Sequence, residues 1–372
     1  MIQKPANKKT ANKKKQGKAV LVTGATGFFG AHLVKELLTE NRQVICLLRD
    51  GDAQRLHRCL EWYFGQGMLM SAKENLKTIK GDISQEYLGM SDRDYIMLTA
   101  RIGEIYHCAA DVRHYAADEE NYLATNVTGT ANMLAFARLA RASFYYMSTC
   151  SVSGDHLKDG REEAVFTEKD YDIGQIWEEN IYVKSKFLAE GLVLQAAREG
   201  LDTKIFRLGR LVGRASDGVF QRNPQTNVFY LILKAFCTLG ELPQKAAQEA
   251  VDLMPIDVCV NEVLALKDGE GLIYHIMSHR PPLFGDVLEA VYENIRIVSD
   301  EEFAETMEKR AAKMDKELSA LLMDHWHRSK TNPPVIKVSN ELTMEHLAQS
   351  GYTPEIPDPK QILKGFFLQD RS

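Results

Sequence analysis

The feature that most constrains this chain is a run of evenly spaced glycines directly after a short apolar stretch. The segment VLVTGATGFFG, residues 20–30, places Gly24, Gly27 and Gly30 three residues apart. Glycines at a strand-to-helix turn let the backbone approach a bound phosphate, and the helix behind them directs free N–H groups at the anion. The segment therefore predicts a nucleotide-binding loop. The alternative is a purely structural turn, since the first interval is one residue longer than in the G-x-G-x-x-G fingerprint.

Short β-branched or aromatic runs alternate with helical patterns from Ala19 to about Leu211. This rhythm predicts an α/β fold with a Rossmann-like, doubly wound parallel sheet, whose ligand crevice lies at the carboxyl ends of the strands. After Gly30 the apolar residues recur on one helical face, as they do in a helix that packs on a sheet. The runs expected to form strands are AVLVT, VICLL, NLKTIKGDI, EIYHCA, SFYYMST and TKIFRL.

The rhythm breaks beyond residue 212. We expect residues 18–214 to form the nucleotide-binding core and residues 215–372 a smaller, mostly helical C-terminal subdomain that faces the substrate. Residues 251–277 contain strand and helix pieces that would return to the core, and residues 299–328 have the pattern of one charged amphipathic helix. Residues 1–17 are polar and lysine-rich and are expected to form a linker or tail.

Composition excludes several classes of function. The net charge of -5 arises from 46 basic and 51 acidic residues spread along 372 positions, so no basic field favours nucleic acid or a membrane surface. No apolar run approaches the roughly 18 residues of a membrane span. The six cysteines show no metal-ligand spacing, so we expect no metal site and a reducing, cytoplasmic location.

The residues after the second expected strand bear on the choice of cofactor. Arg49 ends that strand, ahead of Asp50, and Arg55 and Arg58 follow. An arginine at this point suits the 2′-phosphate of NADP, whereas an acidic residue suits the ribose of NAD. NADPH is therefore expected, although Arg55 and Arg58 could equally lie on a solvated helix face. Asp82, after the third strand, is placed to meet adenine or simply to form a turn.

The clearest catalytic signal is IYVKSK, residues 181–186. Tyr182 and Lys186 are four residues apart, so on a helix they share a face. A tyrosine titrates near pH 10 and needs a nearby cation to work as an acid or base near neutrality, which Lys186 would supply. Upstream, Thr149 ends the run SFYYMST, where a hydroxyl can hydrogen-bond a substrate carbonyl. An ordinary exposed Tyr-Lys pair is the alternative.

Together these motifs resemble an extended short-chain dehydrogenase/reductase. The resemblance rests on the glycine loop, Asp82-Ile83, His107-Cys108-Ala109-Ala110, Asn126-Val127-x-Gly129-Thr130, Ser148-Thr149 and Tyr182-x-x-x-Lys186. Finer features, FRLGRLVGRASDGVFQRN and VDLMPIDV among them, are similar to the thioester reductase domains that end nonribosomal peptide synthetases and carboxylic acid reductases.

This resemblance implies a reaction and a set of site residues. The reaction is NADPH-dependent release of an acyl or peptidyl thioester, held on the phosphopantetheine arm of a carrier protein domain upstream, as an aldehyde or further as an alcohol. Thr149, Tyr182 and Lys186 would be catalytic, and Tyr182 and Lys186 would also hold the cofactor. The other cofactor-binding residues would be Thr23, Gly24, Thr26, Gly27, Phe28, Phe29, Gly30, Arg49, Arg55, Asp82, Ile83, Ala109, Ala110, Asn126, Leu208 and Gly209.

Several alternatives stay open. A nucleotide-sugar epimerase or dehydratase has the same Thr/Tyr/Lys arrangement, and a non-catalytic dinucleotide sensor would keep the glycine loop alone. Cys108 and Cys150 are interpreted as packing residues rather than nucleophiles, and His107 and His114 as structural. Arg207 and Gly209, placed beyond the strand TKIFRL, would either line the nicotinamide pocket or make loop contacts. The resemblance also places residues 214–227 along the substrate channel.

Overall fold

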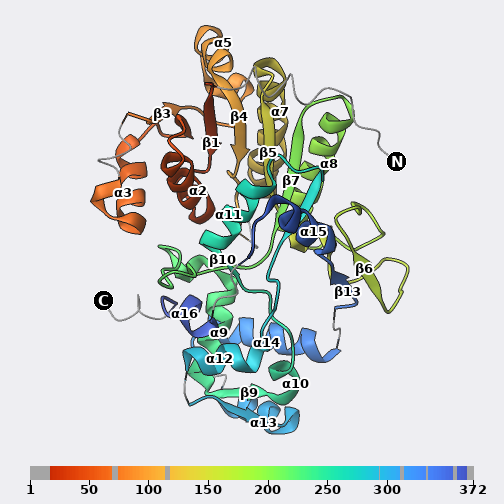
Figure 1. Cartoon of the computed structure of the whole chain (residues 1–372). Coiled ribbons are helices and arrows are strands. Elements are labelled where there is room, and N and C mark those ends of the chain that lie inside the picture. Colours follow the sequence, from red (N-terminus) through yellow and green to blue (C-terminus); the bar gives the residue numbers. More distant parts are fainter. Residues whose placement is uncertain are drawn as a thin grey trace.

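A seven-stranded parallel sheet forms the centre of the computed structural model, which describes residues 17–68, 74–113, 118–292, 294–310, 314–331, 334–354 and 358–366. The strand order is β11-β7-β5-β4-β1-β2-β3 (Figure 1). This confirms the expected doubly wound sheet. The strands are β1 (Ala19–Thr23), β2 (Val44–Leu48), β3 (Leu76–Lys80), β4 (Ile102–His107), β5 (Ser143–Thr149), β7 (Thr203–Leu208) and β11 (Ile273–Ile276).

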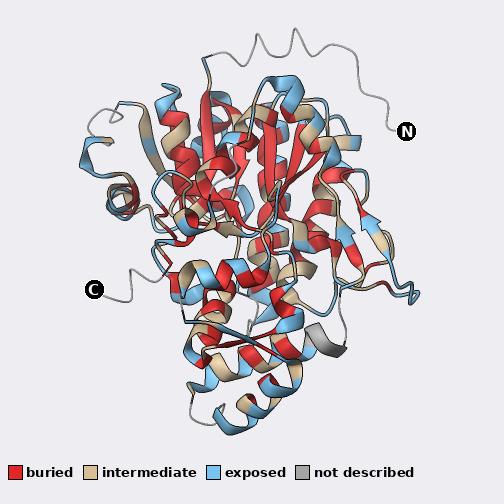
Figure 2. Ribbon diagram, turned by 60° about the horizontal axis from the view of Figure 1, so that its bottom comes forward, coloured by how far each residue is buried: buried red, intermediate tan, exposed pale blue. Residues whose placement is uncertain are grey.

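Helices cover both faces of the sheet, which explains why residues on both faces of its central strands are buried rather than alternating between buried and exposed. Every residue of β1, β2, β5 and β7 is buried (Figure 2). The first apolar cluster includes residues of α2 (Phe28–Thr39), α3 (Ala53–Phe64) and α11 (Ile256–Leu266). The second, on the other face, includes residues of α5 (Asp92–Arg101), α7 (Gly129–Ala140) and α8 (Ile181–Arg198).

A separate apolar cluster organises the helical region of the C-terminal part that occupies the lower half of Figure 1. Residues 299–328, expected to be charged amphipathic helix, form two helices, since α13 ends at Arg310 and α14 begins at Lys316. Both contribute buried apolar side chains to this cluster, Phe303 and Met307 from α13 and Leu322 and Trp326 from α14. The helices here are α9 (Val228–Leu239), α10 (Gln244–Ala247), α12 (Phe284–Val291), α13 (Asp300–Arg310), α14 (Lys316–Thr331) and α16 (Pro359–Leu363).

Short parallel strand pairs connect distant parts of the chain. β8 (Leu211–Val212) pairs with β10 (Met254–Pro255), and β9 (Glu241–Pro243) pairs with β12 (Arg296–Val298). β6 (Ala164–Phe166) pairs with β13 (Ile336–Val338), after which α15 (Glu341–Ser350) packs against α11. Within residues 251–277, β11 forms the edge of the main sheet and α11 packs against α2. The domain boundaries themselves stay a prediction, and residues 1–16 of the expected tail lie outside the described residues.

No helix in the described part of the chain combines the length and the hydropathy that a bilayer crossing needs.

Candidate active site

The glycine loop joins β1 to α2 at the carboxyl edge of the sheet. Gly24 has a φ of 71°, and a Cβ atom there would lie 2.7 Å from the backbone nitrogen of Ala109. A Cβ on Gly30 would collide with the carbonyl oxygen of Gly24. Gly27 is the N-cap of α2 and has no side chain to occupy the first free N–H groups. The three glycines therefore leave a backbone cradle at a helix amino end, which fits a pyrophosphate.

Thr23 ties this loop to β4. Its hydroxyl accepts a hydrogen bond from the Ala109 backbone nitrogen at 3.1 Å and lies 2.8 Å from Nδ1 of His107. The Thr130 hydroxyl, 3.2 Å from Nε2, already donates to the Asn126 carbonyl, so a neutral ring donates from Nε2 and accepts the Thr23 proton at Nδ1. Burial and the neighbouring Lys186 lower the pKa of His107 to about 3, so the ring is neutral. His107 is structural, in agreement with its interpretation from the sequence, whereas His114 lies outside the described residues.

A chain of buried hydrogen bonds continues from His107 to the catalytic helix. His107 Nε2 lies 3.2 Å from the hydroxyl of Thr130, which donates to the carbonyl of Asn126 at 2.7 Å. The Asn126 amide donates to the hydroxyl of Ser185 at 2.9 Å, and Ser185 donates to the carbonyl of Tyr182 at 2.8 Å. Sequence reasoning missed Ser185 and Thr130 as parts of this network, because they lie on different helices.

Thr149, Tyr182 and Lys186 come together at the end of β5. Thr149 is the last residue of that strand, and Tyr182 is in the first turn of α8, which Asn180 caps through the backbone nitrogens of Tyr182 and Val183. The Thr149 hydroxyl hydrogen-bonds the Tyr182 phenol. Lys186, one turn further, is 5% exposed and donates from Nζ to the carbonyl of Met147 at 2.8 Å. The structure thus brings all three predicted catalytic side chains to one place.

The electrostatics of this group differ from expectation in one respect. Burial raises the pKa of Tyr182, the hydrogen bond with Thr149 lowers it, and the nearby Cys150 raises it again. The residue that lowers the pKa of the phenol is therefore Thr149, where the sequence predicted Lys186. Burial lowers the pKa of Lys186 itself to about 8, against a smaller opposing effect of Cys108 and Glu190. Desolvation thus dominates at this end of the crevice.

The arginines after β2 face solvent and already hold acidic partners. Arg49 lies 3.7 Å from the Asp82 carboxylate, with 65% of its side chain exposed. Arg55 pairs with Asp50 at 2.8 Å and Arg58 with Asp52 at 3.4 Å. Asp82 also accepts from the backbone and hydroxyl of Ser84, and its contact with adenine stays a prediction.

The other predicted cofactor residues lie at the same sheet edge but in different surroundings. Phe29 is buried, and Phe28 packs between Tyr63 and Phe220 of the C-terminal part. Ile83 is buried where a Cβ on Gly129 would touch it. Thr26 accepts through its carbonyl from the Cys59 thiol at 3.4 Å. Ala110 follows β4, while Leu208 ends β7 and Gly209 follows it.

Arg207 is not a loop residue, contrary to expectation. It lies within β7, is fully buried and forks onto the equally buried Glu190 at 2.7 Å. His275 lies 3.1 Å from its guanidinium, and Phe166 packs beneath it. These contacts occupy the hydrogen-bond donors and one face of the guanidinium. Arg207 therefore holds α8 to the sheet and does not line a nicotinamide pocket. The signal that sequence reasoning overlooked was its place inside the run TKIFRL.

Neither cysteine near the site has the surroundings of a nucleophile. Burial raises the pKa of both Cys108 and Cys150, and the Cys150 thiol donates to the carbonyl of Arg207 at 3.2 Å. A reactive cysteine needs a lowered pKa. Among the described residues there is also no cluster of His, Cys, Asp or Glu placed to hold a metal ion.

Comparison with known proteins identifies the family. Residues 22–263 match the NAD-binding family described as "Male sterility protein". The chain belongs to this family. It is therefore an NAD(P)-dependent reductase domain that takes a nicotinamide cofactor, and the resemblance seen in the sequence is confirmed.

Similar proteins and structures are parts of peptide synthetases. A component of the linear gramicidin synthase of Brevibacillus parabrevis is 27% identical over 77% of this chain, which spans only 6% of that protein. The structure of a thiolation-reductase di-domain from an archaeal nonribosomal peptide synthetase is 28% identical, with a TM-score of 0.83 over 98% of this chain and 80% of that one. The terminal R domain of the myxalamid pathway is 26% identical, with a TM-score of 0.77 over 95% and 90%.

The structural neighbours also bear on the alternative that the chain is a nucleotide-sugar epimerase or dehydratase. A UDP-galactose 4-epimerase is 16% identical, with a TM-score of 0.59 over 95% of this chain and 99% of that one. That likeness shows the shared fold alone. The peptide synthetase reductase domains are more similar to this chain by both measures.

Proposed function

We propose that this domain uses NADPH to reduce an acyl or peptidyl thioester on the phosphopantetheine arm of a carrier domain, and releases the acyl group as an aldehyde. The observation that carries the proposal is the joined group of Thr149, Tyr182 and Lys186 at the end of β5, next to the glycine cradle. The similarity to a thiolation-reductase di-domain supports the choice of a carrier-bound substrate.

The residues present fit a dinucleotide. The backbone at Gly24, Gly27 and Gly30 lies where Cβ atoms would clash or crowd, and the amino end of α2 is open to an anion. Asn126 hydrogen-bonds the backbone of Asp111, and Thr23 accepts from Ala109, so both hold the loop after β4 that borders this cradle. Ala109, Ala110, Ile83, Leu208 and Gly209 would line the rest of the cofactor path at the sheet edge.

The bound nicotinamide would supply hydride to the thioester carbonyl carbon. The hydroxyls of Thr149 and Tyr182 would donate hydrogen bonds to the carbonyl oxygen as negative charge develops there, and Tyr182 would pass its proton to that oxygen. Lys186 would hold the nicotinamide ribose, and the hydrogen bond from Thr149 would favour the phenolate left behind. The carbon–sulfur bond then breaks while the new hydroxyl group gives up its proton, so that the acyl group departs as an aldehyde. The sulfur takes up that proton and leaves as the thiol of the arm, and Tyr182 regains a proton from solvent.

NADPH rather than NADH is proposed because three guanidinium groups gather after β2. Arg49 is held only loosely by Asp82, and Arg55 and Arg58 lie on the adjoining α3. An arginine that exchanges a solvent-exposed carboxylate for a 2′-phosphate loses little free energy, because exposed ion pairs contribute little to stability. Planar guanidinium groups bind phosphate with forked hydrogen bonds.

The partner would be a phosphopantetheinylated carrier domain, upstream in the same parent chain, and the reaction would take place in the cytoplasm. The linker-like composition of residues 1–17 agrees with such an attachment. The C-terminal part, residues 215–372, would face the carrier and the acyl group.

The test is to mix the purified chain with NADPH or NADH and an acyl-pantetheine thioester and to follow the absorbance of the reduced cofactor. We expect consumption with NADPH that depends on the thioester. If neither cofactor is consumed, while bound NAD and turnover of a UDP-sugar are found, the chain is a nucleotide-sugar enzyme. If nothing turns over although NADPH binds, it is a dinucleotide sensor.

A further inference from the structure

Lys186 shares one face of α8 with a second buried charged residue, Glu190. Tyr182, Lys186 and Glu190 are spaced four residues apart, so their side chains follow one another along the helix. Lys186 and Glu190 are both buried. The catalytic face of α8 therefore continues, one turn beyond the lysine, into a carboxylate that solvent does not reach.

The contacts that Lys186 makes with β5 are with uncharged groups. Its Nζ donates to the Met147 carbonyl at 2.8 Å and lies 4.9 Å from the centre of the Tyr146 ring. Burial raises the pKa of the Tyr146 phenol, so that ring stays neutral. A carbonyl and the face of a ring both attract an ammonium, but neither supplies a countercharge.

The other titratable groups that face Lys186 are neutral, with one exception. Burial raises the pKa of the Cys108 thiol and lowers that of His107 to about 3, so neither is charged near pH 7. Burial also raises the pKa of Tyr182. Among the described residues that act on Lys186, Glu190 is therefore the one with a negative charge.

Glu190 remains ionised because Arg207 on β7 holds it. The buried guanidinium donates from Nε to one carboxylate oxygen at 3.1 Å and from Nη2 to the other at 2.7 Å. Such a forked pair makes a buried carboxylate tolerable. Burial raises the pKa values of the titratable neighbours Tyr146, Tyr171 and Cys150, so they are neutral.

His275 on β11 fixes the orientation of Arg207. Its Nε2 lies 3.1 Å from Nη1 of Arg207, and its Nδ1 lies 2.6 Å from the carbonyl of Ser339. A guanidinium can only donate, so Nε2 accepts and Nδ1 donates its proton to Ser339. Burial lowers the pKa of His275 to about 3, in agreement with this neutral ring.

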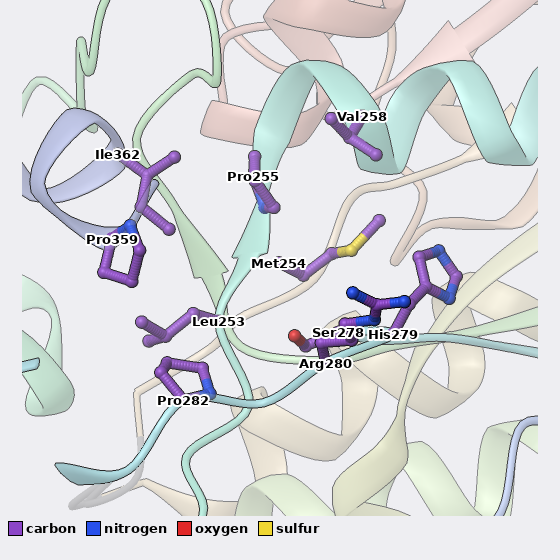
Figure 3. A pocket seen from close by; sticks show the side chains of 10 residues that line it. All are labelled: Leu253, Met254, Pro255, Val258, Ser278, His279, Arg280, Pro282, Pro359 and Ile362. Carbon is purple, nitrogen blue, oxygen red and sulfur yellow. The ribbon is translucent and has the colours of Figure 1, made fainter. Parts of the chain in front are cut away.

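The chain offers a matched comparison in Glu262 on α11. This residue is as fully buried as Glu190, and its carboxylate lies 2.6 Å from Nε2 of His279, whose ring lines a pocket of about 100 Å³ (Figure 3). α11 packs on the opposite face of the sheet from α8. Within the described residues, Lys186 thus has Glu190 beside it and not Glu262.

We propose that Glu190 is a positioning residue of the active site, whose carboxylate keeps Lys186 charged as an ammonium while Arg207 and His275 hold that carboxylate in place. Its consequence for the reaction rests on the proposed function, in which Lys186 holds the nicotinamide ribose. Glu190 acts through Lys186 and touches neither cofactor nor substrate. Without the carboxylate, Lys186 should lose its proton about one pH unit lower.

The test is the pH profile of kcat/KM with NADPH and an acyl-pantetheine thioester. In wild type we expect a fall with a midpoint near pH 8, and in E190Q the same fall about one pH unit lower. E190D keeps the carboxylate and should keep the wild-type midpoint, as should the matched control E262Q. An E190Q midpoint equal to that of wild type would overturn the proposal.

A double variant separates the charge of Glu190 from its part in the fold. E190Q leaves Arg207 buried without its carboxylate, which can destabilise the chain, whereas E190Q/R207M removes both charges and is better tolerated. If Glu190 acts through its charge, the double variant should keep the lowered midpoint. A return to the wild-type midpoint would show that the ion pair is only structural and would refute the proposal.

A measurement without substrate separates this inference from the proposed function. Lys186 is titrated by NMR in chains labelled with ¹³C at the lysine Cε, and its signal is assigned by its absence from K186R. We expect a midpoint near pH 8 in wild type and about one unit lower in E190Q. Equal midpoints would refute the role of Glu190. Different midpoints in a chain that does not oxidise NADPH with a thioester would support that role and refute the proposed function alone.

Discussion

The two ends of the dinucleotide crevice differ in exposure to solvent. Lys186 and Thr149 are buried in hydrogen-bonded surroundings, whereas 65% of the Arg49 side chain is exposed. Burial strengthens electrostatic effects and shifts pKa values, while water and salt screen charges at the surface. Substitutions at the buried end, around Thr149 and Lys186, should therefore alter the reaction rate. Substitutions at the solvent-exposed end, around Arg49, should alter only the affinity for the cofactor.

Replacing Tyr182 with Phe should give the largest effect, because it removes the proton donor at the buried end. We expect kcat to fall by about 10²–10⁴, measured as NADPH consumption with an acyl-pantetheine thioester. The control is Tyr87→Phe, which removes a phenol hydroxyl from a side chain that is 56% exposed. A Tyr182→Phe chain with the full rate would contradict the assigned role.

Gly24 lies against the backbone that follows β4, so Gly24→Ala should destabilise the fold strongly. The new methyl group would lie 2.7 Å from the Ala109 backbone nitrogen. In addition, the alanine would have to adopt the positive φ of 71° that Gly24 has. We expect a loss of about 3 kcal/mol in the free energy of urea unfolding. Gly240→Ala, with a φ of 80° and open space around it, is the matched control and should cost about 1 kcal/mol. Equal losses of unfolding free energy in the two variants would mean that the close approach of residue 24 to the backbone after β4 does not contribute to stability.

The pH dependence of the rate tests the charge on Lys186. Its pKa is lowered to about 8, so the ammonium is present below that pH and is lost above it. If catalysis needs the charge, kcat/KM should fall by about tenfold per pH unit above pH 8. A Lys186→Arg chain that retains activity should lack this fall, since a guanidinium keeps its proton. A wild-type profile that stays flat through pH 10 would show that the ammonium is not required.

Substitution of Arg49, at the solvent-exposed end, should give the smallest effect on the reaction. In Arg49→Gln we expect the KM for NADPH to rise by about tenfold, the equivalent of about 1.4 kcal/mol, with kcat unchanged and NADH affected little. R93Q, at an exposed residue of α5, serves as the surface control. An equal rise for NADPH and NADH would argue against contact with the 2′-phosphate.

Local patterns in the sequence were sufficient for the main sheet and for the catalytic group. Short β-branched or aromatic runs predicted the strands, and the four-residue interval between Tyr182 and Lys186 predicted their shared face on α8. These features depend on residues close in the chain, so periodicity and spacing reveal them.

The parts that sequence reasoning missed depend on contacts between distant residues. Arg207 was expected just beyond the strand, either in the nicotinamide pocket or in loop contacts. It lies buried within β7 instead, and only its pairing with Glu190 from α8 makes that burial tolerable. The pairing of His279 with Glu262 and the split between α13 and α14 likewise follow from packing in the C-terminal part. No local pattern marks such partners in advance.

The central proposal, thioester reduction by NADPH, is tested most directly by counting products. The wild-type chain is incubated with acyl-pantetheine and NADPH, and the aldehyde is trapped and measured alongside the oxidised cofactor. We predict one aldehyde for each NADPH consumed, and none from Tyr182→Phe. Release of free thiol and carboxylic acid without oxidation of NADPH would show that the chain hydrolyses thioesters and would contradict the proposal.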